Sequence, residues 1–396
     1  MQPVDGRLGE QGRITTRQKQ PDVAFRSAAS VLLTEADARP GPAQVREPDK
    51  ATAATKAEGS DESSGRHGEH GSSGLWECPA MIIHAVADVP SVQHKLVLWK
   101  SGRDSLHVVS LGGFQTRHEA VLTLVDQADQ ENDGPAFGPI LIHTDDRPIR
   151  TIDEHARSYA FCSAPGYLDV AVPDFVFGGW PEVGIDDFDQ TAARMAAAGE
   201  QPAELPLAGW IGSCHLNLVR RALLGLGRTH PDLLDVHHVQ WVHGPSGLQT
   251  VDQNHLSLPE QVGRWNALVD VEGLGYSGRL KLLLHSGRPV LVQDRPWREW
   301  YWDSLVPLEH YVPVRRDLSD LVDRARWVQQ NPQQAEHIGR SGQKLAQRLL
   351  TRASAVEEWG RTLSVAGHTS AEGWAPHTVR EHLGPVLGRL GAALGS

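Results

Sequence analysis

The distribution of apolar residues along the chain predicts strands and helices in alternation. Leu96–Lys100 and Ser105–Leu111 are short apolar runs joined by a Ser-Gly-Arg-Asp turn, and they predict two strands. Thr116–Gln130 predicts a helix because its apolar residues recur at helical spacing, at Ala120, Val121, Leu124 and Val125. Phe137–Asp146 then predicts a buried strand that ends in acidic residues. This alternation is typical of a layered α/β fold.

The alternation continues through the second half of the chain. An apolar strand and a loop rich in Gly, Pro and carboxylates are expected within Gly166–Gln190, and strand-and-helix pairs follow. The pattern restarts near residue 265 with a strand at Ala267–Val271, a short helix at Arg279–His285 and a buried strand at Pro289–Gln293. These three elements form one βαβ unit. Two more helices are expected, the second with Asn331 as N-cap and Pro332 in its first position.

The pattern divides the chain into four parts. Residues 1–74 are rich in Ser, Gly, Glu and Ala, and we expect a disordered tail because this composition buries too little apolar surface to offset the entropy of ordering. Residues 75–264 are predicted to form an N-terminal Rossmann-like domain and residues 265–352 a C-terminal one. C-terminal helices are expected over residues 353–396.

Composition and charge narrow the class of protein. The net charge of −11 over 396 residues argues against a general nucleic-acid binder. Three widely spaced cysteines fit neither a disulfide framework nor a zinc site. No apolar run approaches the roughly 18 residues of a membrane span, and the first residues lack the apolar core of a secretory signal. We therefore expect a cytoplasmic protein with at most peripheral membrane contact.

A glycine turn offers the first candidate chemistry. Gly273, Gly275 and Gly278 form a G-x-G-x-x-G pattern, and Asp294 follows after the next strand, as in an NAD-binding fingerprint. However, Glu272 directly precedes the first glycine, and the helix that follows is short. Arg279 and Lys281 supply cations directly after the turn, which favours phosphate binding. A purely structural turn remains a third interpretation.

The residues that follow the turn resemble glycosyltransferase family 90, which includes protein O-glucosyltransferases and capsule- and lipopolysaccharide-modifying proteins. The resemblance runs across residues 275–346. It rests on Ser277-x-Arg279-x-Lys281, Asp294, Glu299-Trp300, Leu305-x-Pro307, His310-Tyr311-x-Pro313-Val314 and Asp317–Leu321. Upstream, the segment 209–224 is similar to the family's second phosphate-side segment.

The resemblance implies a GT-B fold, in which two Rossmann-like domains face each other across a cleft and the C-terminal domain holds UDP. It implies that Ser277 and Arg279 contact the UDP phosphates, with Lys281 as support or as a solvated helix residue. Arg220 is expected to reach the same diphosphate from the opposite domain, and Glu299 to bind the ribose hydroxyls. The glycines of the binding turns are Gly212, beside Ser213, and Gly273 and Gly275.

No metal or cofactor is expected beside the donor sugar nucleotide. GT-B enzymes generally neutralise the leaving UDP with helix ends and cations, and no Asp-x-Asp triplet stands out as a metal site. The acidic run His143–Asp146 is interpreted as turn chemistry.

The catalytic base is where the chain departs from the family. In animal members the catalytic Asp lies two positions before a proline, and the matching position here is Gly179, before Trp180-Pro181. Asp174 and Glu182 are the two candidates for the base, with Asp186 and Asp187 next, and loop-solvating acids are the alternative reading.

The sequence therefore predicts a glycosyltransferase that moves glucose, xylose or a similar sugar from a UDP-sugar to an acceptor hydroxyl. The expected acceptor is a glycan or lipid-linked precursor of lipopolysaccharide or capsule. Two alternatives stay open: an NAD-dependent oxidoreductase, and a non-catalytic nucleotide-sugar-binding protein suggested by Gly179.

Overall fold

The computed structural model describes residues 81–87, 94–100, 106–132, 136–149, 158–215, 217–244, 247–250 and 255–369. All of them belong to one compact unit, Gly74–Ser396. The expected disordered tail, residues 1–74, lies outside the described residues, as does the end of the chain beyond Thr369.

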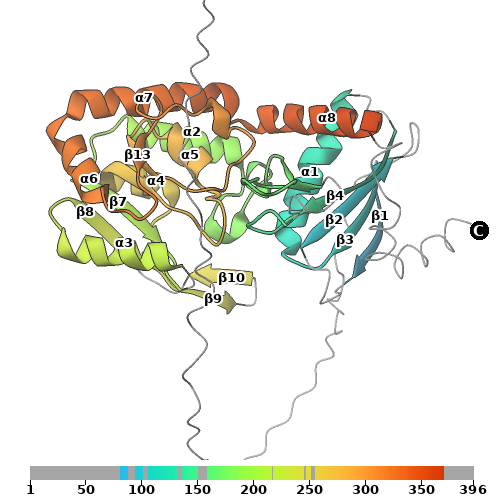
Figure 1. Cartoon of the computed structure of the whole chain (residues 1–396), viewed down its shortest axis with the longest axis horizontal. Helices are drawn as coiled ribbons and strands as arrows, with labels where there is room; N and C mark the ends of the chain where they lie inside the picture. The colour runs from blue at the N-terminus through green and yellow to red at the C-terminus, as the bar shows by residue number, and fades with distance from the viewer. Residues whose placement is uncertain are drawn as a thin grey trace, which may run out of the picture. The chain divides into compact units, whose positions relative to one another are not determined.

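A mixed six-stranded sheet is built from the first part of the described chain (Figure 1), in the order β1-β3-β2-β4-β5-β6. Its strands are β1 (Met81–Ala87), β2 (Lys95–Lys100), β3 (Leu106–Leu111), β4 (Phe137–His143), β5 (Tyr159–Ala160) and β6 (Val170–Ala171). The predicted strands at β2, β3 and β4 are confirmed. The predicted helix is also confirmed, as α1 (Gln115–Asn132), and its apolar face is buried at Val121, Leu124 and Val125.

A second sheet contains five strands in the order β13-β12-β11-β7-β8, and every pairing in it is parallel. These strands are β7 (Leu205–Gly212), β8 (Leu234–His238), β11 (Trp265–Asp270), β12 (Val290–Gln293) and β13 (Val312–Val314). Parallel strands are covered on both faces, which explains the continuous apolar runs at β11 and β12. A separate antiparallel ribbon pairs β9 (Trp241–Gly244) with β10 (Gly247–Thr250).

Helices precede, separate and follow the strands of the second sheet along the chain and confirm the α/β class. They are α2 (Phe188–Gly199), α3 (Leu218–Thr229), α4 (Leu258–Arg264), α5 (Leu280–His285), α6 (Leu321–Gln330) and α7 (Pro332–Leu349). Helix α7 begins with Asn331 as its N-cap residue and Pro332 in its first position, as predicted. The Asn331 side chain does not cap that helix; it donates back to the Trp327 carbonyl at 2.9 Å.

The second sheet spans the domain boundary expected at residue 265. Strands β7 and β8 precede that point, and β7 lies directly beside β11, which follows it. Helix α8 (Arg352–Thr369) packs against α1 (Figure 1), so the C-terminal helix contacts the layer of the first sheet. The hydrogen bonds between strands thus determine which strands share a sheet, and the point where the sequence pattern restarts does not.

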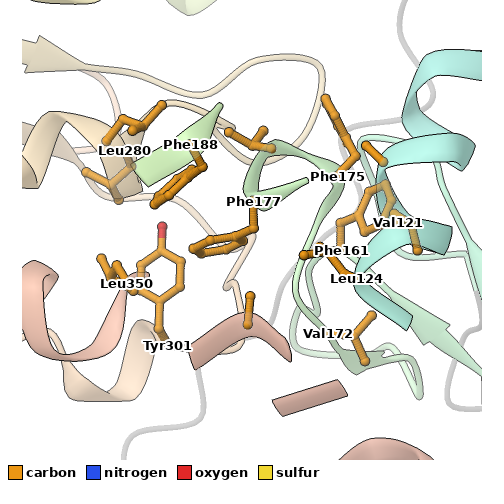
Figure 2. Close-up of a cluster of buried hydrophobic side chains, with 14 of the residues drawn as sticks. Val121, Leu124, Phe161, Val172, Phe175, Phe177, Phe188, Leu280, Tyr301 and Leu350 are labelled. Carbon is orange, nitrogen blue, oxygen red and sulfur yellow. The ribbon is translucent and has the colours of Figure 1, made fainter. Parts of the chain in front are cut away.

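One hydrophobic core continues from α1 to the helices of the second sheet. Figure 2 shows Val121 and Leu124 of α1, the phenylalanines of the loop after β6, and Leu280 of α5 in a single cluster. The rings of Phe177 and Phe188 lie 4.6 Å apart at its centre. A second apolar cluster includes Val269 and Leu291 of the five-stranded sheet together with residues of α6 and α7.

The strand expected after Gly166 is largely absent from the described residues there. Only β6 pairs, over Val170–Ala171, and Phe175–Phe177 form a 3-10 turn, η1, with Asp174 at its N-terminus. All three η1 residues are buried. A short apolar run buried on every side has no amphipathic period, which is why the sequence pattern did not separate this turn from a strand.

Candidate functional site

A cavity of about 590 Å³ lies at the carboxyl ends of strands from both sheets. One wall consists of the turn after β4 and of the loop from Phe175 to Ile185. The other wall consists of the end of β7, the first turn of α3 and the glycine turn after β11. Ligands of α/β proteins bind at this edge of a parallel sheet.

The glycine turn, residues 272–279, is held by the last residue of β11. Asp270 is fully buried, and its Oδ1 accepts a hydrogen bond of 2.5 Å from the Ser277 hydroxyl. Its Oδ2 lies 2.7 Å from Nη2 of the buried Arg295. The Gly273 N–H donates to the Tyr276 carbonyl at 3.2 Å and closes the turn. Both Gly273 and Ser277, which the sequence predicts as donor-binding residues, line the cavity.

Two arginines line the cavity beside this turn, Arg220 and Arg279. Arg279 donates to the Ile211 carbonyl at 2.8 Å, and its Nη2 is buried without a hydrogen-bond partner among the described residues. Burial lowers the pKa of Arg279 to about 10, and the nearby Arg220 guanidinium adds to this effect against the attraction of Asp270. A buried guanidinium with a free N–H is suited to a bidentate anion.

Arg220 comes from the same sheet as Arg279 and not from an opposite domain, because α3 follows β7 directly and β7 pairs with β11. Its Nε donates to the Glu272 carbonyl at 2.9 Å and its Nη1 to the Ser213 carbonyl at 3.0 Å. Both guanidiniums lie over the Trp210 ring, at 5.5 Å for Arg220 and 5.2 Å for Arg279. The structure thus places Arg220 beside the glycine turn and corrects the expectation that it comes from an opposite domain.

Gly212 and Ser213, which the sequence predicts as donor-binding residues, also line the cavity. A Cβ on Gly212 would lie 2.8 Å from the Trp210 ring, so a side chain there would displace that ring. The sequence analysis missed Trp210 and Asn217, which line the same wall. Asn217 caps α3 by accepting from the Arg220 N–H at 3.1 Å and donates to the Glu272 carbonyl at 3.2 Å. Its position directly before a predicted helix was the available sequence signal.

Gly275 is not among the residues that line the cavity. A Cβ there would lie 1.6 Å from the Asp146 carbonyl oxygen, so Gly275 makes room for the turn after β4. In a dinucleotide fingerprint the second glycine makes room for the pyrophosphate. Here protein backbone takes that space, which speaks against the NAD interpretation.

Lys281, Asp174 and Glu299 lie together in the protein interior, and none of the three lines the cavity. The Lys281 ammonium is 2.9 Å from Asp174 and 2.7 Å from Glu299, which also accepts from the Tyr301 hydroxyl at 2.7 Å. Burial raises the pKa of Glu299 to about 7, against the opposing effect of Lys281. This placement corrects the expectation that Glu299 faces a ribose and that Asp174 ends a strand beside the acceptor.

The other three acids considered as the catalytic base either accept hydrogen bonds from protein groups or lie exposed at the surface. Glu182 accepts a hydrogen bond from the Thr116 hydroxyl and does not line the cavity. Asp187 caps α2 by accepting from the Gln190 N–H at 2.6 Å, and Asp186 is exposed. Gly179 has a φ of +131°, a conformation that side-chain-bearing residues rarely adopt.

Among the described residues, no cluster of three or more His, Cys, Asp or Glu side chains is arranged to hold a metal ion. Within the same residues, no helix combines the length and the apolar character needed to cross a membrane.

The fold and the cavity define an α/β protein with an arginine-lined site at the carboxyl ends of its strands. The family described as Glycosyl transferase family 90 matches residues 139–363, more than half of the 396-residue chain. The chain therefore belongs to this family, as the motifs after the glycine turn indicated.

Several curated proteins are similar over part of the chain. Protein O-glucosyltransferase 3 of Homo sapiens is 30% identical over 131 residues, which cover 33% of this chain and 26% of that protein. Protein 035R of Invertebrate iridescent virus 3 is 28% identical over 318 residues, or 73% of this chain and 27% of that protein. The chain thus spans about a quarter of the length of these two relatives.

Among solved structures, Anabaena HepE in complex with UDP-glucose is similar at a TM-score of 0.29 and 11% identity, over 47% of this chain and 46% of HepE. Because this similarity is low, the fold is described from the sheet topology of the chain itself.

Proposed function

We propose that this protein is a glycosyltransferase that moves a sugar from a UDP-sugar to an acceptor hydroxyl. Family membership supports the reaction class. The observation that carries the proposal is the pair of guanidiniums, Arg220 and Arg279, that lines the cavity beside Ser277. In this arrangement the diphosphate binds between the two arginines and the glycine turn, and the guanidiniums stabilise the negative charge that develops on the leaving UDP.

The choice of donor sugar rests on the named relatives and on the family resemblance, and the choice of acceptor on that resemblance. Relatives named protein O-glucosyltransferase favour glucose, and the resemblance stated above also admits xylose. A lipopolysaccharide or capsule precursor is our proposed acceptor. The two-sheet arrangement, with the cavity at strand ends of both sheets, supports a GT-B-like organisation.

A non-catalytic nucleotide-sugar-binding protein is the second candidate. It is favoured by Gly179, whose positive φ disfavours an acidic residue at the position that the family resemblance matches to the catalytic Asp of animal members. Under this alternative the protein binds UDP-sugars in the cavity but catalyses no transfer, so no UDP is released.

Ligand-dependent thermal stability separates the proposal from an oxidoreductase. UDP at 100 times its dissociation constant should stabilise the protein by about 2.7 kcal/mol, and NAD should not. UDP release from a panel of UDP-glucose, UDP-xylose and UDP-galactose, with and without candidate acceptors, then separates an enzyme from a binding protein. Stabilisation by NAD and not by UDP would contradict the proposal.

A further inference from the structure

Asp270 connects two residues of the proposed donor site. It is the last residue of β11, it is fully buried, and it does not line the cavity. Its Oδ1 accepts the hydrogen bond of the Ser277 hydroxyl and lies 3.8 Å from the Nε of Arg279. Both of these partners line the cavity. One carboxylate behind the cavity wall thus holds two side chains that form the wall.

Arg295 approaches Asp270 from the neighbouring strand. It follows the end of β12 by two positions, and β12 pairs with β11. Its Nη2 lies 2.7 Å from the second carboxylate oxygen of Asp270, and within the described part of the chain this is its one ion pair. None of its three guanidinium nitrogens makes a hydrogen bond of good geometry there. Arg295 is 1% exposed and does not line the cavity, so it does not contact a ligand in it.

Asp270 also opposes the positive charge of the site. Among the described residues, it lies within ion-pair distance of Arg279 and Arg295, and no acid lies that close to Arg220. Burial lowers the pKa of Arg220, and the attraction of Asp270 acts against this effect. Burial also acts to lower the pKa of Arg295, but Asp270 holds that pKa above its usual range. Three guanidiniums therefore share one carboxylate, which leaves positive charge for a bound anion.

Two further carboxylates, Asp145 and Asp146, line the cavity. Asp146 pairs with Arg117, whose Nη1 lies 2.9 Å from its Oδ1, and it attracts Arg220 less strongly than Asp270 does. The Asp145 Oδ1 accepts the Asp146 N–H at 2.7 Å. Neither forms an ion pair with the three guanidiniums, so neither replaces Asp270 as their partner.

A buried ion pair can also be purely structural. Replacing both members of such a pair by apolar residues is often neutral or stabilising, whereas removing one member leaves a buried charge without compensation. Lys100 and Asp129 form a second buried pair at 2.7 Å, and neither of them lines the cavity. The contacts of Asp270 with Ser277 and Arg279 distinguish its pair from this one.

We propose that Asp270 and Arg295 are positioning residues of the donor site, an inference that rests on the proposed function. Asp270 holds Ser277 and the Arg279 guanidinium in the arrangement that binds the diphosphate. Arg295 compensates the charge of Asp270 from behind and so keeps its carboxylate in place. Neither residue touches the ligand.

The test compares replacements of this pair with the same replacements of the control pair, Lys100 and Asp129. The variants are Arg295→Met, Asp270→Leu with Arg295→Met, and, as the control, Asp129→Leu with Lys100→Met. Both double replacements leave the net charge unchanged, so a change in UDP affinity reports orientation and not long-range attraction. Calorimetry measures UDP affinity, and urea titration measures the free energy of unfolding.

Arg295→Met should lose stability, because the Asp270 carboxylate then stays buried without its cation. The double replacement of Asp270 and Arg295 should regain much of that stability. It should still bind UDP at least about tenfold more weakly, the loss expected when hydrogen bonds to a charged ligand are weakened. The KM for UDP-glucose, measured as UDP release with water as acceptor, should rise in parallel. The control double variant should bind UDP as the parent protein does.

Each other outcome has a distinct meaning. A double variant of Asp270 and Arg295 that regains both stability and full UDP affinity overturns the assignment, because the pair would then be structural only. A double variant that does not fold also overturns it, since the fold itself would then need the pair. An equal loss of UDP affinity in the control pair overturns it as an indirect effect of a weakened core. A parent protein that binds no UDP overturns the proposed function instead.

Discussion

The carbonyl oxygen of Asp146 lies where a side chain of residue 275 would begin, 1.6 Å from the position of a Cβ on Gly275. This contact joins the turn after β4 to the turn after β11, two segments that come from different sheets. Gly275→Ala should therefore destabilise the protein by about 1–3 kcal/mol, because backbone on one side must move. Urea unfolding measures the change.

Gly225 provides the matched control for Gly275. It lies within α3, and nothing stands within 4 Å of a Cβ placed there. Gly225→Ala should stabilise the protein by about 0.5–1 kcal/mol, since alanine restricts the unfolded chain. Equal effects of the two substitutions would show that the contact with Asp146 is not tight.

Arg279 should contribute directly to UDP affinity. Arg279→Ala should weaken UDP binding by about 1.5–3 kcal/mol, the range for hydrogen bonds to charged groups. Arg279→Lys should recover only part of this loss, because an ammonium lacks the planar fork of a guanidinium. Isothermal calorimetry with UDP measures both variants.

Arg221 is the control for the cavity arginines. It neighbours Arg220 on α3, is exposed and does not line the cavity. Arg221→Ala should leave UDP affinity unchanged. If Arg221→Ala and Arg279→Ala weaken binding equally, long-range charge and not direct contact attracts the nucleotide.

Lys281 should govern stability and not ligand affinity. It compensates two buried carboxylates, Asp174 and Glu299. Lys281→Met should cost about 3–5 kcal/mol, because both acids would stay buried without a cation. The combined variant with Asp174→Asn and Glu299→Gln should regain much of this loss. Weak UDP binding in a stable Lys281→Met protein would instead restore the phosphate-side role that the sequence suggested.

His118 should make the protein sensitive to acid. Burial, followed by the charges of His94 and Arg117, lowers its pKa from 6.5 to about 4. Between those two values the unfolded chain binds a proton that the folded protein does not, so stability is lost as the pH falls from 6.5 towards 4. His118 contributes at most about 1.4 kcal/mol per pH unit to the slope of the free energy of unfolding against pH.

His118→Gln removes the titrating group and should flatten this part of the stability curve. Urea unfolding at several pH values between 4.5 and 7.5, in both proteins, measures the difference. Parallel curves for the parent and the variant would show that His118 does not carry the acid sensitivity.

The sequence predicted most elements because their patterns are local. Helix α1 and strands β2, β3 and β4 follow from periodicity, and the start of α7 follows from Asn331 and Pro332. Local patterns did not predict which strands pair to form each sheet. That β7 pairs with β11 depends on hydrogen bonds between segments far apart in the chain, which no local pattern encodes.

The candidate site shows the same difference between what local sequence patterns predict and what depends on tertiary packing. Gly273, Ser277 and Arg279 lie within one short motif and line the cavity as expected. Lys281 belongs to the same motif, yet its side chain reaches the interior, since only the three-dimensional turn decides which residues face a ligand. Asp145 and Asp146 were interpreted as turn residues because their proximity to the glycine turn arises from tertiary packing.

The carboxylate of Asp270 lies within ion-pair distance of two guanidiniums, those of Arg279 and Arg295, and Arg220 lies close enough to depress the pKa of Arg279. Because Arg220 and Arg279 line the cavity, inorganic anions should bind there as well as a diphosphate. Sulfate or phosphate in a buffer should therefore compete with the sugar nucleotide, and donor affinities measured in chloride, sulfate and phosphate buffers of equal ionic strength should differ. The choice of buffer anion becomes a variable of every binding experiment on this protein.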